Sequence, residues 1–174
     1  MMLRLFLEVT VSFTLALYWF PGDLDLVISP LEGDKPILVL PLVPDERFTL
    51  HYIHSVDKSP VWEEHSVDEF GNIYIEEEVF VKFGAGMGHW TGHGTLTKKG
   101  PYQAIVNIHE RIGDFVLRVG GEGIDHAILW RGKRFDLSNL AAGQAVSVSA
   151  HKVSLLERLW RRVIPYATFH TREQ

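Results

Sequence analysis

Histidine and glutamate recur between Phe48 and Gly88 at spacings that could bring their side chains together. Side chains alternate between the two faces of a β-strand. In the expected strand 47–56, His54 shares a face with apolar residues, so we predict that it points inward. In the expected strand 73–83, Glu77 is the one acid on the apolar face, and Glu76 and Glu78 are assigned to a solvated face.

Glu63 and His65 share a phase between those two strands, so each of the three runs offers an ionisable group to its more apolar side. A buried charge is unfavourable unless it is paired or ligated. One interpretation is an internal His–Glu pair that holds the register of the strands. A second is a site for a metal or small cation at His54, Glu63, His65 and Glu77. A third is general acid–base catalysis by His54 with a glutamate.

A glycine-rich segment, Gly84 to Gly88, follows the last of these strands. Its spacing does not fit a dinucleotide fingerprint, and no Gly-Lys-Ser/Thr follows, so nucleotide binding is not indicated. His89 and His93 are weak metal candidates, like His54 and His65, because they lack the helix and the glutamate of a zinc-protease motif. The sequence predicts no cofactor.

Composition excludes several classes of protein. The chain has 174 residues, a net charge of −5 and no cysteine. A general nucleic-acid binder should be basic. Disulfide scaffolds, thiol catalysis and cysteine-based zinc sites all require cysteine. The length predicts one domain with its own core.

The first 22 residues resemble an export segment. Arg4 precedes an apolar run from Val9 to Phe20, whose length is typical of a signal-peptide core. Tyr18 and Trp19 suit a membrane interface. We therefore expect residues 1–22 to be a signal peptide or membrane anchor, and the remainder to lie outside the cytoplasm, anchored in the cell envelope or secreted. A buried first element of the domain is the alternative.

The rest of the chain to residue 150 predicts short strands separated by Gly, Asp, Asn and Pro. No helical stripe separates them, so parallel βαβ winding is not indicated. Arg131-Gly132-Lys133 is predicted as a tight hairpin turn. The expected fold is all-β, an antiparallel β-sandwich or partly closed barrel over residues 23–150. The further strands expected are 24–28, 37–43, 103–109, 114–119, 125–131, 134–137 and 144–150.

Residues 151–174 carry five Lys/Arg and two acids, a net charge of +3. From Ser154 to Ile164 the apolar residues recur at helical spacing, and Glu157 completes a capping box with Ser154. This predicts a short amphipathic helix. It either closes one end of the sandwich or contacts anionic lipid or an acidic partner.

Three groups of residues resemble the small bacterial and archaeal family known as domain of unknown function DUF1850. They are His54-Ser55-Val56, then Ser59-Pro60-Val61 with Glu63 and Glu64, then Phe83-Gly84-Ala85-Gly86. The resemblance implies a short exported or anchored β domain, often encoded beside TRAP transporters of the TAXI type. It also implies a candidate site at His54, Ser55, Glu63 or Glu64, and Gly84 to Gly86.

These observations together predict a non-enzymatic extracytoplasmic domain that is accessory to a TAXI-type TRAP solute transporter. Its partner would be the permease or the solute-binding protein. The alternative is a ligand- or metal-binding module that uses His54, Glu63 and Glu77, and a metal-dependent hydrolase is a third possibility.

Overall fold

Two antiparallel β-sheets face each other across an apolar core. The computed structural model describes residues 24–33, 35–82 and 94–154, which form twelve strands and one short helix. The elements are β1 (Leu24–Pro30), β2 (Leu38–Leu42), β3 (Arg47–Ile53), β4 (Pro60–Val67), β5 (Ile73–Phe80), β6 (Thr95–Lys99), β7 (Tyr102–Val106), β8 (Glu110–Arg111), β9 (Phe115–Arg118), β10 (Ala127–Trp130), β11 (Lys133–Asp136), α2 (Leu137–Ala141) and β12 (Ala145–Lys152).

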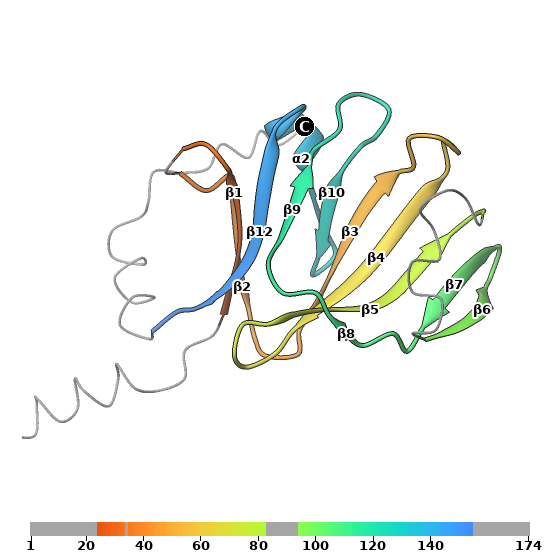
Figure 1. Cartoon of the computed structure of the whole chain (residues 1–174), viewed down its shortest axis with the longest axis horizontal. Coiled ribbons are helices and arrows are strands. Elements are labelled where there is room, and N and C mark those ends of the chain that lie inside the picture. Colours follow the sequence, from red (N-terminus) through yellow and green to blue (C-terminus); the bar gives the residue numbers. More distant parts are fainter. Residues whose placement is uncertain (1–23, 34, 83–93, 155–174) are drawn as a thin grey trace, which may run out of the picture.

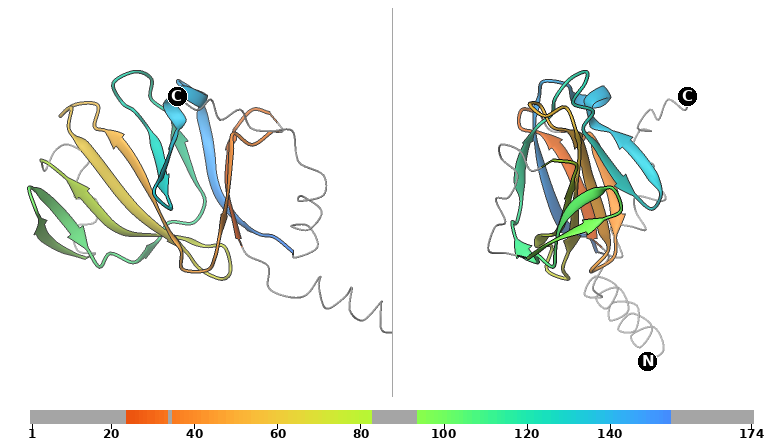
Figure 2. Two further views of the ribbon diagram at one scale, coloured as in Figure 1. Left: turned by 180° about the vertical axis from the view of Figure 1, so that it is seen from behind. Right: turned by 90° about the vertical axis from the view of Figure 1, so that its right-hand side faces the viewer.

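The small sheet has the strand order β2-β1-β12-β9, and the large sheet has the order β11-β10-β3-β4-β5-β7-β6, with β8 paired to β5. All pairs are antiparallel. The chain passes between the sheets several times, for example from β2 to β3 and from β9 to β10. In Figure 1, β6 and β7 lie at the end of the large sheet that is farthest from the small sheet. Figure 2 shows the same arrangement from behind and from the side.

The main core fills the space between the sheets. Alternate residues of β1, Leu24, Leu26 and Ile28, are fully buried, as strand periodicity requires. They belong to one cluster with Phe48 and Leu50 from β3 of the large sheet. Burial of such side chains contributes about 1.5–3 kcal/mol each. This cluster holds the two sheets together.

A second apolar cluster lies on the same buried face of the large sheet, toward β7. It consists of Val61, Ile75, Phe80, Ile105 and Ile108. The Tyr52 side chain packs against both clusters and therefore marks the junction between them.

A β-bulge between β4 and β5 decides which acids face the core. Glu63 pairs with Glu78 and Glu64 with Glu77, but His65 then pairs with Ile75, so Glu76 is an extra residue on β5. A bulge reverses the alternation of all residues beyond it. Ile75 and Glu78 are accordingly buried on the same side, although they are three positions apart.

The segment after β7 packs onto this bulge. Asn107 and His109 both have positive φ, 59° and 45°, which is uncommon for residues other than glycine. Between them, Ile108 enters the second cluster, and its N–H donates to the carbonyl of Glu76 at 3.1 Å. This loop therefore satisfies a backbone acceptor of the extra residue in the bulge.

The expected all-β antiparallel fold is confirmed, and the described strands form two open sheets rather than a closed barrel. The predicted hairpin turn is confirmed: Arg131 and Gly132 both have positive φ between β10 and β11. Three elements were not predicted from the sequence: β6, β8 and α2. The first turn of α2 is capped by Asp136. Strand β12 continues to Lys152, two residues beyond the expected end of the β domain.

Two expected elements lie outside the described residues: the export segment 1–22 and the C-terminal helix that begins near Ser154. Within the described part of the chain, no helix is long and apolar enough to cross a membrane.

Candidate functional site

The two faces of the large sheet carry different glutamates of β4 and β5. Glu63 and Glu78 lie on the face that carries the buried clusters. Glu64 and Glu77 line a groove on the opposite, outer face. From the sequence we predicted the reverse for β5, with Glu77 inward and Glu78 solvated. That prediction is wrong because it carried the alternation of Ile73 and Ile75 past the extra residue.

On the buried face, Tyr52 and two glutamates form a polar group at the junction of the apolar clusters. The Tyr52 hydroxyl donates to Glu63 Oε1 at 2.9 Å. Glu78 is the register partner of Glu63 and is only 4% exposed. Its Oε2 atom is buried without a hydrogen-bond partner. We call Glu63 and Glu78 the carboxyl pair.

Burial is the largest cause of the pKa shifts of these groups. It raises the pKa of Glu63, although the Tyr52 hydrogen bond opposes this effect. Burial, together with the charge of Glu63, raises the pKa of Glu78 to about 7. Burial and the charge of Glu63 also raise the pKa of Tyr52, so its hydroxyl keeps its proton.

His65 is a neutral imidazole held beside the carboxyl pair. Its ring stacks between Phe48 and Phe115, with centroid distances of 5.1 and 5.7 Å. Burial lowers the pKa of His65 to about 4. His65 Nδ1 lies 3.0 Å from the carbonyl oxygen of Glu63, which can only accept, so Nδ1 carries the proton. Nε2 is then an acceptor, and it lies 3.9 Å from Glu63 Oε2.

His126 supports the other side of Tyr52. The two rings stack with centroids 5.4 Å apart. His126 Nδ1 accepts from the N–H of Gly120 at 2.9 Å, and the Ser138 hydroxyl donates to the carbonyl of Gly120 at 2.7 Å. Burial lowers the pKa of His126, so this ring is also held neutral. The Tyr52 ring thus packs against an imidazole that is itself held by a hydrogen bond.

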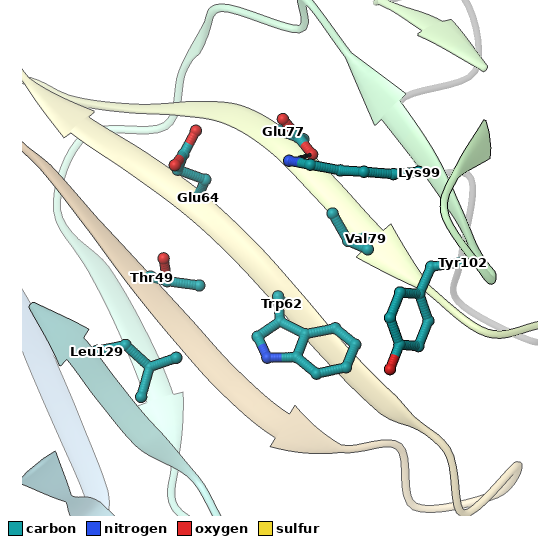
Figure 3. Close-up of a pocket in the computed structure, with 8 residues that line it drawn as sticks. All are labelled: Thr49, Trp62, Glu64, Glu77, Val79, Lys99, Tyr102 and Leu129. Carbon is teal, nitrogen blue, oxygen red and sulfur yellow. Dashed lines mark hydrogen bonds and ion pairs between the residues drawn. The ribbon is translucent and has the colours of Figure 1, made fainter. Parts of the chain in front are cut away.

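The outer face of the large sheet carries a groove of about 290 Å³, which we call the outer groove. Figure 3 shows its lining residues, Thr49, Trp62, Glu64, Glu77, Val79, Lys99, Tyr102 and Leu129. Trp62 stacks on His51 at 5.1 Å and meets Tyr102 edge to face at 5.1 Å. The floor of the groove is therefore aromatic and aliphatic, and its charges gather on one side.

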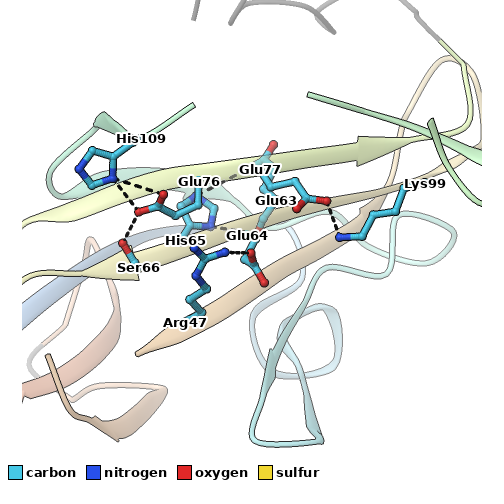
Figure 4. A network of polar contacts seen from close by, with 9 residues as sticks. All are labelled: Arg47, Glu63, Glu64, His65, Ser66, Glu76, Glu77, Lys99 and His109. Atoms are coloured by element: carbon cyan, nitrogen blue, oxygen red, sulfur yellow. Dashed lines mark hydrogen bonds and ion pairs between the residues drawn. The ribbon is translucent and has the colours of Figure 1, made fainter. Parts of the chain in front are cut away.

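Each acid on the outer face has a partner from another strand or loop, as Figure 4 shows. Arg47 forms an ion pair with Glu64, and Lys99 Nζ lies 2.5 Å from Glu77 Oε1. Glu76 accepts from Ser66 Oγ at 2.6 Å and from His109 Nδ1 at 3.0 Å. Burial alone would raise the pKa of Glu76, but these two hydrogen bonds help to lower it. The charged side of the groove is consequently balanced.

The structure separates the residues that the sequence analysis grouped. Glu63 faces inward as predicted, and so does His65. Glu64, an alternative for the family glutamate, lies on the outer face with Glu77. His54 lies just after β3, where its Nδ1 accepts from the Asp57 N–H at 3.2 Å, and Ser55 is exposed in the same turn.

The remaining predicted positions, Gly84, Gly86, His89 and His93, lie outside the described residues. Within residues 24–33, 35–82 and 94–154, no group of three or more His, Cys, Asp or Glu side chains is arranged to hold a metal ion. The predicted cluster of His54, Glu63, His65 and Glu77 is therefore not a metal site as proposed, since Glu77 lies on the opposite face from Glu63.

Several residues that define the two sites were not predicted from the sequence: Glu78 and His126 on the buried side, and Thr49, Trp62, Val79, Lys99, Tyr102 and Leu129 in the outer groove. Tyr52 was in phase with the core residues Phe48 and Leu50, so its inward position could be read from the sequence. Its hydrogen bond to Glu63 required the register of β3 against β4.

Comparison with known proteins bears on family rather than activity. The family model described as a domain of unknown function (DUF1850) matches residues 48–137, slightly more than half of the chain. That segment runs from β3 to the start of α2 and contains both the carboxyl pair and the outer groove. Searches of curated proteins and of solved structures gave no match. The chain belongs to the DUF1850 family.

Proposed function

We propose that this protein is a non-enzymatic, extracytoplasmic binding domain that is accessory to a TAXI-type TRAP solute transporter. Its partner is the permease or the solute-binding protein, and the outer groove is the surface that binds it. Residues 1–22 act as the signal peptide or anchor that takes the domain to the cell envelope. The association with a transporter rests on the family resemblance, and the choice of surface rests on the geometry.

The outer groove is proposed as the binding surface because it contains a partly exposed aromatic pair. Trp62 and Tyr102 lie side by side over an aliphatic floor that includes Val79 and Leu129. Tryptophan and tyrosine are enriched among the residues that dominate binding energy at interfaces. A concave, mostly apolar surface with few polar groups at its edge is the usual form of a binding site.

The charges beside the groove indicate how it would bind. Glu64 and Glu77 each have a cation of their own, Arg47 and Lys99. Because these ion pairs are balanced and partly exposed, they add little net attraction. Burial of the aromatic floor then supplies most of the affinity, and we expect binding to depend only weakly on salt.

Co-purification from native membranes tests this proposal. Tagged full-length protein is isolated from membranes of its own organism, as the wild type and as Trp62→Ala. Phe70→Ala is the matched control, because Phe70 is 69% exposed in the turn between β4 and β5 and does not line the groove. The wild type and Phe70→Ala are expected to recover a TRAP permease or binding protein, and Trp62→Ala to lose it. No recovery by the wild type, with normal solute uptake after deletion, would contradict the proposal.

A second candidate is a small-molecule binding module that uses the same groove without a protein partner. The groove volume of about 290 Å³ is the observation that favours it, since it approaches the lower end for ligand pockets. Calorimetric titration with small carboxylates and divalent cations distinguishes the two. Heat of binding that Trp62→Ala abolishes supports the small-molecule site, and a flat titration removes it.

A further inference from the structure

The carboxyl pair places two acids opposite each other inside the domain. Glu63 and Glu78 are direct register partners on one face of β4 and β5. Opposed side chains in an antiparallel pair have Cβ atoms about 5 Å apart, and like charges there are destabilising. Glu78 is 4% exposed, whereas the Glu63 side chain is 22% exposed. The pair is therefore buried at one end and reached by solvent at the other.

The hydrogen-bonding groups around the pair leave an excess of acceptors. Tyr52 supplies one donor, to Glu63 Oε1. The nearest ring nitrogen of His65 is an acceptor, and it faces Glu63 Oε2 at 3.9 Å. Glu78 Oε2 is buried and has no partner. If both carboxyl groups were ionised, these acceptors would face one another in an apolar environment.

The groups that surround the pair do not neutralise it. Tyr52 comes from β3 and His65 from β4. His126 comes from the loop before β10 and stacks on Tyr52. Both imidazoles are neutral because burial lowers the pKa of each. The second cluster adds only apolar side chains, including Ile105 and Ile108. Within the described residues, no arginine or lysine contributes to the ionisation of Glu63 or Glu78.

We propose that Glu63 and Glu78 form a proton-binding pair that holds one proton in mildly acidic conditions and releases it as the pH rises through neutrality. The proton supplies the donor that the cluster lacks and removes one of the two opposed charges. Within the described residues no group of three or more His, Cys, Asp or Glu side chains is arranged to hold a metal ion. This site lies on the opposite face from the outer groove and is independent of the proposed function.

Release of the proton has a structural consequence. The pair lies at the junction of the two apolar clusters, next to the bulge. Two negative charges at this point oppose the close packing of β4 against β5. The pair thus makes the stability of the large sheet sensitive to the pH of its compartment.

The direction of the effect follows from linkage. The pKa of each carboxyl group is raised in the folded protein, so the folded state binds the proton more tightly than the unfolded state does. The pair's contribution to stability is complete at pH values below the ordinary glutamate range. It is lost as the pH rises through about 7, the pKa of Glu78. The proton belongs to the pair rather than to one residue.

The first test measures unfolding of the purified full-length protein by denaturant between about pH 5 and about pH 9. Below the ordinary pKa of histidine, neutral His65 changes the free energy of unfolding with pH in the opposite direction. The quantity to follow is therefore the difference in free energy of unfolding between the wild type and the variant. We expect Glu78→Gln to gain stability relative to the wild type as the pH rises. Glu77 is the adjacent residue on the outer face, and Glu77→Gln should differ from the wild type in stability by the same amount at every pH. A constant difference for Glu78→Gln would overturn the proposal.

The second test detects the proton directly and does not depend on a variant that folds. Infrared or carbon-13 NMR spectra of the wild type should show a carboxylic acid signal that disappears with a midpoint near pH 7. Glu78→Gln and Glu63→Gln should each lack this titration. Full ionisation of all glutamates at pH 6 would overturn the proposal. So would the loss of the acid signal on addition of Na⁺, K⁺ or Ca²⁺ at constant pH, because the pair would then hold a metal cation.

Discussion

Glu63 and Glu78 oppose each other on the buried side of the large sheet, while their sequence neighbours Glu64 and Glu77 oppose each other on the outer side. The register of β4 against β5 therefore places the two glutamate pairs in different environments. The inner acids lack cationic partners among the described residues, and the outer acids have Arg47 and Lys99. The inner pair is the proposed proton site, whereas the outer pair lines the outer groove.

Tyr52→Phe should shift the titration of the carboxyl pair to higher pH. The Tyr52 hydroxyl donates to Glu63 and lowers the pKa of that carboxyl group, so its removal makes ionisation harder. The loss of one hydrogen bond should also cost about 1 kcal/mol in the free energy of unfolding. Infrared titration measures the midpoint. Tyr102→Phe, on the outer face, is the control and should leave it unchanged; an unchanged or lower midpoint in Tyr52→Phe would contradict this role.

His65 should destabilise the fold in acid. Its folded pKa of about 4 lies below the ordinary value of 6.5, so the unfolded state takes up a proton first as the pH falls. The contribution of neutral His65 to the free energy of unfolding is complete above about pH 6.5. It declines between about pH 6.5 and about pH 4, by a total on the order of 3 kcal/mol. His65→Phe should remove this slope, while the exposed His109→Phe should retain it. Acid denaturation followed at fixed denaturant measures the slope, and a steep slope in His65→Phe would contradict the assignment.

Gly71→Ala should destabilise the turn between β4 and β5. Gly71 has φ of 87°, and a Cβ there would lie 2.8 Å from the carbonyl oxygen of Ala150 in β12. Both the strained backbone and the contact oppose the substitution, so the loss should exceed about 1 kcal/mol. Gly121→Ala is the matched control, since its Cβ would meet nothing within 4 Å. Equal denaturation midpoints for the two variants would show that the turn does not pack on β12 in this way.

Residues 1–22 should direct the domain out of the cytoplasm. A tag at the C-terminus is then digested by protease added to intact spheroplasts, and deletion of residues 1–22 leaves it protected inside. Protection of the tag in the full-length protein would contradict the export proposal.

Much of the fold follows from local sequence patterns. The alternation of buried residues in β1 and β3, and the turn at Arg131-Gly132, match the expected elements. Strand β6, Thr95–Lys99, was missed because all five of its residues are exposed and carry no alternation. Helix α2 was missed because five residues are too few for a helical stripe.

The candidate site could be predicted only in part. Glu63 and His65 lie on the uninterrupted strand β4, so simple alternation gave their direction correctly. On β5 the three glutamates at 76–78 contain no local signal for an extra residue, because the bulge depends on pairing with β4 and on the loop at Ile108. The directions of Glu77 and Glu78 were therefore predicted wrongly because they depend on tertiary pairing. The outer groove likewise requires side chains from six strands.

Site-specific photo-crosslinking in native membranes tests the proposed function most directly. A photoreactive residue at Thr49, at the edge of the outer groove, is compared with one at Phe70, which lies in the turn between β4 and β5. We predict a crosslink to a TRAP permease or solute-binding protein from position 49 and none from position 70. The absence of a transporter adduct from position 49, or equal adducts from both positions, would contradict it.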